Sequence, residues 1–247
     1  MTRTRFIGVD YDPLTLDDLL DRFAQRPAAA RFAYLVTPNV DHVVRLHDPM
    51  PDGDAVWAAY RGAEWCVCDS RILAALARRQ GIALPVAPGS DLTALILERL
   101  CRPGDRIAII GGRAETAERL RARYPALDIV HHAPPMGLRR NAAALEAAAR
   151  FAAGTGARFL FLSVGSPQQE LLAARIAAQP GATGIGLCVG AAVEFVVGEQ
   201  TRAPELMQRL HLEWAHRLLG NPRRMWRRYL VEGPRIFLLA RRHRLGG

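Results

Sequence analysis

Long apolar runs are absent from this chain of 247 residues. No stretch reaches the roughly 18 consecutive apolar residues that a membrane-spanning helix requires, and the opening MTRTRF lacks the apolar segment of a secretory signal. We therefore expect a protein that is made and kept in the cytosol. Because 50% of the residues are hydrophobic, the chain can bury a good core as one α/β domain with a small appendage.

Metal-binding side chains are scarce as well. Cys66 and Cys68 share one face of an expected strand, but no second Cys or His pair stands at zinc spacing, so we expect the four cysteines to be reduced core thiols. The pair His131-His132 has no acid or Cys partner and is interpreted as a loop or strand end. The best metal candidate, Asp52-Gly53-Asp54, lies in a Pro/Gly-rich loop. The sequence predicts no metal and no other cofactor.

Lysine is missing altogether, since all 33 basic residues are arginines. Residues 202–247 carry 11 arginines and three acids, a net charge of +8, whereas the other 201 residues together carry only +1. Such an asymmetry indicates a surface for phosphates, whether of a membrane, a lipid pyrophosphate or a nucleic acid. Exclusive use of arginine also fits a bias in genome composition, so the inference rests on where the charge lies.

Two strand–turn–helix units organise residues 158–230. The apolar runs at 159–162 and 184–189 have the length of buried strands, and each leads into a glycine and a helical pattern. Such turns lie at the carboxyl ends of parallel strands, where unpaired N–H groups at helix N-termini bind anions. Gly165 allows the turn, Ser166 is the expected cap, and the next turn brings Gln168, Gln169 and Glu170 beside any ligand. The pattern also suits an ordinary strand-to-helix connection.

The earlier part of the chain shows the same alternation. Strands are expected at residues 5–9, 32–36, 64–68, 106–110 and 127–130, with helices such as 15–23, 40–46 and 71–80 between them. The expected fold class is α/β, a Rossmann-like parallel sheet flanked by helices, spanning 1–203 and followed by a basic C-terminal helical appendage at 204–247. Gly111-Gly112 begins a dinucleotide fingerprint, but Thr116 follows where its third glycine would be.

Polar residues follow two of these strands. Thr37 and Asn39 come after the strand at 32–36, and Asp69 with Ser70 comes after the strand at 64–68. Each can simply cap the helix that follows, and Asp69 can also serve as a base. We expect Asp69, Thr37 and Ser166 to line one hollow at the carboxyl edge of the sheet.

The order of several motifs resembles one enzyme family. The chain reads GSPQQE from Gly165, VGAAVEF from Val189, Arg-Ala-Pro from Arg202, Glu-Trp from Glu213 and Pro-Arg-Arg from Pro222. This order resembles the WecG/TagA/CpsF family of bacterial glycosyltransferases, more thinly back to Phe6. The resemblance implies a metal-independent, inverting enzyme that moves a sugar from a UDP-sugar to a polyprenyl-pyrophosphate-linked saccharide in surface polysaccharide synthesis. It also implies a position on the inner face of the cytoplasmic membrane, where copies of the chain can associate.

The resemblance also implies roles for individual residues. Asp69 and Thr37 are the expected catalytic residues, with Asp69 as the general base, and Thr37 and Asn39 face the sugar nucleotide. The chain departs from the family pattern at Ser70, where a glycine is usual, at Val86 and Ala87, where an arginine is usual, at Gln168 for lysine and at Glu194 for aspartate. Further contacts to substrate are expected from Ser166, Gln168, Gln169, Glu170, Gly190, Glu194, Arg202, Arg223, Arg224, Arg227 and Arg228. With two cations missing near the phosphates, the arginines of the appendage become more necessary.

Two other classes of function remain open from the residues. A nucleic-acid-binding protein would use the basic tail, but the aromatic interleaving or recognition helix of such proteins is not found. A nucleotide-cofactor oxidoreductase would rest on Gly111-Gly112 alone. The residues 236–240, IFLLA, followed by RRHR, have the composition of an interfacial membrane anchor, and they equally suit a terminal helix packed on the core.

Overall fold

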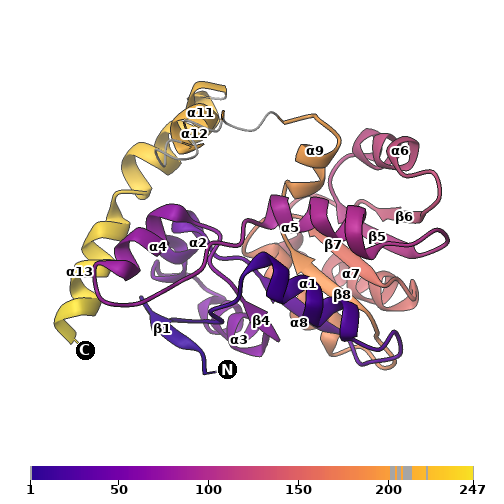
Figure 1. The fold of residues 1–247 in the computed structure, drawn as a ribbon, viewed down its shortest axis with the longest axis horizontal. Coiled ribbons are helices and arrows are strands. Elements are labelled where there is room, and N and C mark those ends of the chain that lie inside the picture. The colour runs from indigo at the N-terminus through magenta and orange to yellow at the C-terminus, as the bar shows by residue number, and fades with distance from the viewer. Residues whose placement is uncertain (1, 201–203, 205–206, 208–212, 221, 247) are drawn as a thin grey trace.

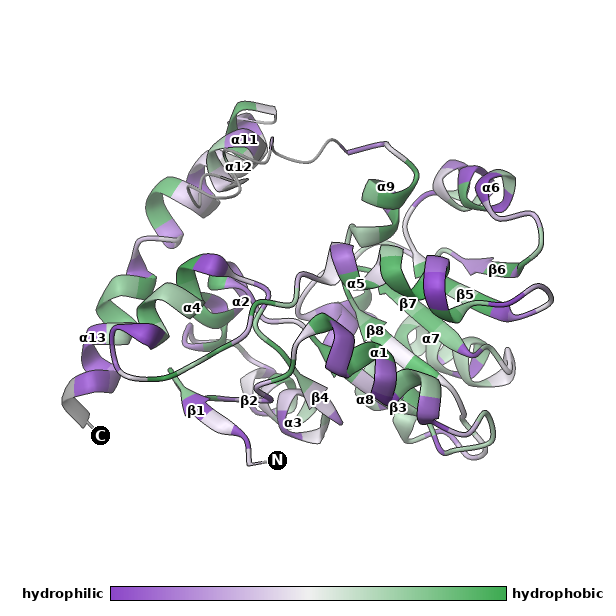
Figure 2. Cartoon of the chain, viewed as in Figure 1, coloured by the Kyte–Doolittle hydropathy of each residue, from purple (hydrophilic) through white to green (hydrophobic). Residues whose placement is uncertain are grey.

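A six-stranded parallel sheet forms the centre of the protein in the computed structural model, which describes residues 2–200, 204, 207, 213–220 and 222–246 (Figure 1). The strand order is β4-β3-β8-β7-β5-β6. The strands are β3 (Ala33–Val36), β4 (Trp65–Cys66), β5 (Arg106–Gly111), β6 (Asp128–His132), β7 (Phe159–Ser163) and β8 (Ile185–Cys188). Buried apolar side chains fill β3, β5, β7 and β8, as expected for strands covered on both faces (Figure 2). The predicted α/β class is confirmed.

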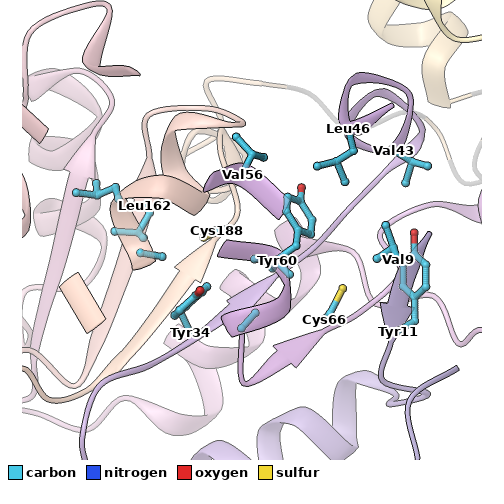
Figure 3. Packing of buried hydrophobic residues seen from close by; sticks show 14 of the residues in the cluster. Val9, Tyr11, Tyr34, Val43, Leu46, Val56, Tyr60, Cys66, Leu162 and Cys188 are labelled. Atoms are coloured by element: carbon cyan, nitrogen blue, oxygen red, sulfur yellow. The ribbon is translucent and has the colours of Figure 1, made fainter. Parts of the chain in front are cut away.

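Helices cover both faces of the sheet. One face carries α2 (Val40–Leu46), α3 (Gly53–Gly62), α4 (Arg71–Arg78), α7 (Ala142–Gly154) and α8 (Gln168–Ala177). The other carries α1 (Leu16–Gln25), α5 (Gly89–Leu95), the π-helical η1 (Ile96–Leu100), α6 (Ala114–Arg123) and α9 (Ala192–Val196). A short 3₁₀ turn, η2 (Leu138–Arg140), precedes α7. Each face is packed into a separate apolar core, and Figure 3 shows part of the first.

The first expected strand, at residues 5–9, is wrong. The chain instead forms a hairpin of β1 (Thr4–Phe6) and β2 (Val9–Tyr11), in which Phe6 pairs with Val9. Ile7 and Gly8 make the two-residue turn, with φ of 46° and 73°. Both values are positive, as in the type I′ turns that match the twist of a hairpin. Ile rarely adopts this conformation, so the sequence gives little warning of the turn.

The C-terminal segment is helical and returns to the domain. It contains α11 (Glu213–Gly220), α12 (Pro222–Trp226), the π-helical η3 (Arg227–Glu232) and α13 (Arg235–Gly246). The expected boundary at 203/204 falls in a stretch of which only Pro204 and Met207 are described. Within the described ranges, no helix is long and apolar enough to cross a membrane.

Helix α13 is packed on the domain by one of its faces. Ile236 and Ala240 are buried in the same core as the hairpin, and Gln80 Nε2 donates to the Ala240 carbonyl at 2.9 Å. Arg235 donates to both carboxylate oxygens of Asp48, at 3.1 and 2.5 Å. The adjacent side chains Phe237 and Leu238 are 54% and 60% exposed. Residues 236–240 are therefore a helix packed on the core by one face, and the other face is exposed to solvent.

Candidate active site

A cavity of about 380 Å³ lies between the rim of the sheet and the C-terminal helices. Asn39, Asp41, Asp69 and Arg71 contribute its polar wall. The opposite wall is largely apolar and comes from the C-terminal segment, with Trp214, Tyr229, Leu230, Ile236 and Phe237. The cavity therefore brings carboxylates at strand ends against an apolar helical surface.

Asp69 stands at the carboxyl end of the β4 segment. Its backbone N–H donates to the Pro38 carbonyl at 3.1 Å, and the preceding Cys68 forms an isolated bridge with Val86. The cap of α4 is Ser70, whose hydroxyl accepts from the Leu73 N–H at 3.2 Å. Ser70, rather than Asp69, therefore caps α4.

Thr37 and Asn39 follow β3, but their side chains differ in position. Thr37 is 2% exposed, and its hydroxyl donates to the Cys188 carbonyl at 3.0 Å, which ties β3 to β8. Asn39 caps α2 by accepting from the His42 N–H at 3.2 Å, and it also lines the cavity. In this structure Asn39 is therefore at the cavity wall, whereas Thr37 lies beneath it.

The first turn of α8 points inward more than expected. Gln169 is 1% exposed, donates to the Cys188 carbonyl at 3.2 Å and accepts from the Gly190 N–H at 3.0 Å. Glu170 is fully buried, and its Oε1 accepts from Gln169 at 3.0 Å and from Tyr60 at 3.3 Å. Glu170 therefore has no surface open to a ligand, and Gln169 fixes the turn at Gly190.

Ser166 and Gln168 lie at the start of α8 but outside the cavity wall. Pro167 rather than Ser166 occupies the cap position. Gln168 donates to the Val164 carbonyl at 3.1 Å. Arg45 joins this segment to the cavity, because it pairs with Asp41 at 2.8 Å and donates to the Ser166 carbonyl at 3.1 Å. Asp69, Thr37 and Ser166 thus share one edge of the sheet, but only Asp69 lines the cavity.

The buried acid Glu170 is electrostatically unusual. Burial raises its pKa above the ordinary 4.5, and the hydrogen bonds from Gln169 and Tyr60 offset only part of that effect. Its second oxygen, Oε2, is buried without a hydrogen-bond partner. The carboxyl consequently favours its neutral form more than an exposed glutamate does.

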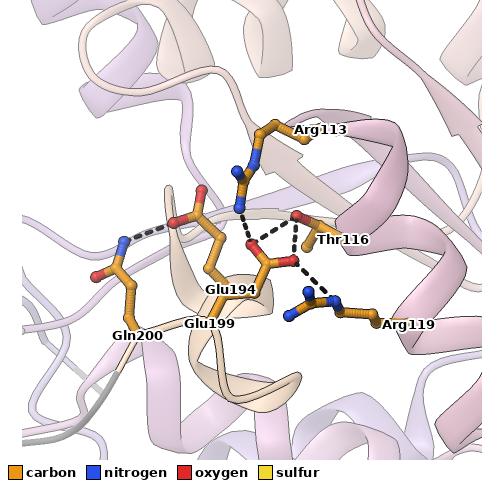
Figure 4. A network of polar contacts seen from close by, with 6 residues as sticks. All are labelled: Arg113, Thr116, Arg119, Glu194, Glu199 and Gln200. Carbon is orange, nitrogen blue, oxygen red and sulfur yellow. Dashed lines mark hydrogen bonds and ion pairs between the residues drawn. The ribbon is translucent and has the colours of Figure 1, made fainter.

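A second polar cluster joins the segment after β8 to the start of α6 (Figure 4). The Glu199 carboxylate accepts from Arg113 at 2.5 Å and from Thr116 at 3.0 Å, and it lies 3.8 Å from Arg119. Burial acts to raise the pKa of Glu199, but the bonds from Arg113 and Thr116 outweigh it and lower the pKa. Glu194, an expected ligand contact, accepts from Gln200 at 2.5 Å. No local motif relates residues 113–119 to Glu199, so the sequence alone does not reveal this cluster.

The structure describes only some of the arginines that the sequence predicts to contact substrate in the appendage. Arg223 and Arg227 are exposed, and Arg227 pairs with Glu232 at 3.0 Å. Neither lines the cavity. Among the described residues, Arg71 is the arginine that does. Arg202 and the side chains of Arg224 and Arg228 lie outside the described part of the protein.

The metal candidates have other partners. Asp52 forms a bidentate ion pair with Arg139, whose hydrogen bond lowers the Asp52 pKa. His131 contacts the Gly111 carbonyl at 3.0 Å, and His132 stacks on Phe151. Among the described residues no cluster of three or more His, Cys, Asp or Glu could hold a metal ion.

A family model described as the glycosyl transferase WecG/TagA/CpsF family matches residues 4–247, which is nearly the whole chain.

Proposed function

The chain belongs to the WecG/TagA/CpsF family of glycosyl transferases, and we propose that it transfers a hexose or N-acetylhexosamine-type sugar from a UDP-sugar to a polyprenyl-pyrophosphate-linked saccharide, with inversion. The observation that carries this proposal is the shared cavity of Asp69 and the apolar C-terminal helices. A saccharide joined to a lipid presents a hydroxyl and an apolar chain together. A cavity with one carboxylate wall and one apolar wall suits such an acceptor.

We assign the UDP-sugar donor to the carboxyl edge of β5 and β7. The chain leaves β5 toward β6 on one side of the sheet and leaves β7 toward β8 on the other, which makes the space between β5 and β7 a topological switch point. Nucleotides bind at such points in open α/β sheets. Gly112 is exposed there, and Gly165 has open space around it. The backbone at both turns can therefore approach a diphosphate.

The chemistry requires one proton acceptor and a stabilised leaving group. Asp69 takes the proton of the acceptor hydroxyl. The hydroxyl oxygen of the acceptor forms a bond to the anomeric carbon, and the bond from that carbon to the UDP oxygen breaks. The departing UDP receives hydrogen bonds from N–H groups around residues 165–168 and from arginines of the appendage. Each charge-assisted bond contributes about 1.5–3 kcal/mol, so two or three would lower the barrier substantially.

We assign the appendage to the cytoplasmic membrane surface. Its described residues expose several large apolar side chains: Leu219, Trp226, Leu230, Val231, Phe237 and Leu238. Exposed arginines lie beside them at residues 223, 227, 235, 241, 242 and 244. Apolar side chains beside cations favour binding at an anionic lipid surface. Such binding would bring the cavity to a lipid-linked acceptor.

The test combines a donor panel with a variant of the base. Purified protein would be offered UDP-ManNAc, UDP-ManNAcA, UDP-glucose and related donors with a lipid-pyrophosphate sugar acceptor, with and without EDTA. We expect transfer from one donor, undiminished by EDTA, and a loss of at least about 100-fold in kcat for Asp69→Asn. Glu118→Gln, which changes an exposed acid on α6, is the matched control. A folded Asp69→Asn protein with full activity would refute the assignment of the base.

A further inference from the structure

Glu199 is held unusually firmly for a residue outside the core. Its side chain is 5% exposed and accepts from Arg113 and Thr116, with Arg119 close by, so three side chains from the start of α6 surround one carboxylate. Thr116 is itself 2% exposed. Charge-assisted bonds of this kind are stronger than neutral ones, and they fix geometry when the acceptor is shielded from water. The cluster is therefore a rigid link between α6 and the segment after α9.

The two ends of this link reach the donor region. Arg113 directly follows Gly111-Gly112 at the end of β5, where the positive φ values of the glycines shape the turn. On the other side, the N–H of Glu199 donates to the Glu194 carbonyl at 2.9 Å. The next residue, Gln200, donates through its side chain to the Glu194 carboxylate at 2.5 Å. Holding Glu199 thus also holds the side chain of Glu194 (Figure 4).

Another contact between α6 and α9 holds the two helices together, but it does not replace the link through Glu199. Arg123 donates to the Val196 carbonyl at 2.7 Å, which fixes the end of α9 to α6. That bond reaches the backbone only, and it leaves the rotamer of Glu194 undetermined. The bond from Gln200 fixes the rotamer, and the placement of Gln200 depends on Glu199.

We infer that Glu199 is a positioning residue for donor binding, which holds the Glu194 carboxylate and the Gly112–Arg113 turn in a fixed relation on opposite sides of the bound nucleotide-sugar. This inference rests on the proposed function. It adds a residue that touches no reacting atom and acts through Glu194 and Arg113. Its loss should weaken recognition of the donor and leave the chemical step and the acceptor unaffected.

The experiment compares Glu199→Gln, Glu199→Asp and the control Glu118→Gln in the full chain. Glu199→Gln keeps the size of the side chain but removes the charge that Arg113 and Arg119 face. We expect the KM for the UDP-sugar, and the Kd for UDP alone, to rise about ten-fold, as for the loss of one charge-assisted bond. The kcat and the KM for the acceptor should stay within about two-fold of wild type. Glu199→Asp keeps the charge and should recover most of the donor affinity.

Hydrogen exchange separates the two proposals. In Glu199→Gln, peptides that cover residues 190–200 and 111–119 should exchange faster, whereas those from α7 should not change. Unchanged exchange in these peptides would overturn the role of Glu199. So would a fall in kcat together with equal rises in the KM for the donor and the KM for the acceptor. Absence of UDP binding and of transfer in the wild type would instead overturn the proposed function, and exchange would still decide whether Glu199 is the link.

Discussion

Replacement of Glu170 by glutamine should make the protein more stable at neutral pH. The carboxyl is fully buried, one of its oxygens has no hydrogen-bond partner, and burial raises its pKa above 4.5. Between 4.5 and the higher pKa of the folded state, the folded protein binds more protons than the unfolded chain. Stability is therefore lost as the pH rises through this window. Glutamine has nearly the same shape and no charge, so the variant should not show this loss.

The expected size follows from the linkage. One proton bound in the folded state alone changes the free energy of unfolding by at most about 1.4 kcal/mol per pH unit. In a chain of this length, about 1 kcal/mol shifts Tm by roughly 2–4 °C. The Tm of Glu170→Gln should equal that of wild type near pH 4.5 and exceed it by up to roughly 3–5 °C for each pH unit above that. The difference should stop growing above the pKa of the folded state.

The assay is thermal unfolding from about pH 4.5 to pH 8 in buffers of equal ionic strength. Glu118→Gln serves as the control, because its side chain is exposed and its Tm should follow that of wild type at every pH. A difference between Glu170→Gln and wild type that does not change with pH would show that the buried carboxyl does not titrate in this range. A variant that becomes less stable than wild type as the pH rises would contradict the sign of the shift.

Three further predictions concern contacts described above. Thr37→Val removes the buried hydroxyl that bonds to the Cys188 carbonyl and should cost about 1–3 kcal/mol of stability, measured by urea unfolding. Gly8→Ala should cost about 1–2 kcal/mol in the same assay, because its φ is 73° and a Cβ would lie 3.3 Å from the Trp57 ring. Phe237→Ser combined with Leu238→Ser should weaken sedimentation with anionic vesicles by at least about ten-fold while Tm changes little, since both side chains are largely exposed.

The sequence predicted the elements better than the directions of side chains. Strand periodicity located β3, β5, β7 and β8, and the expected helix at 15–23 is α1, which Thr15 caps within a capping box with Asp18. Such features depend on neighbouring residues, so a local pattern reveals them. The hairpin at Ile7-Gly8 was missed because its turn uses a residue that avoids positive φ.

The position of the candidate site in the fold could be predicted from the sequence, but most contacts between its side chains could not. Asp69 and Asn39 line the cavity at strand ends, as the order of elements implies. Gln169 and Glu170 turn inward because α8 packs against α3, which no local pattern shows. The partnership of Glu199 with Arg113 depends on a contact across 86 positions, and only the folded chain reveals it.

The edge-to-face contact of Phe6 with His243, at 5.5 Å between ring centroids, joins the hairpin to α13, which lies far from it in the sequence. The hairpin is synthesised long before α13, so the contacts between them form only after residues 235–246 have been translated. A nascent chain arrested before residue 235 would lack α13 and would expose the part of this core that Ile236 and Ala240 cover, which would favour aggregation of the truncated product.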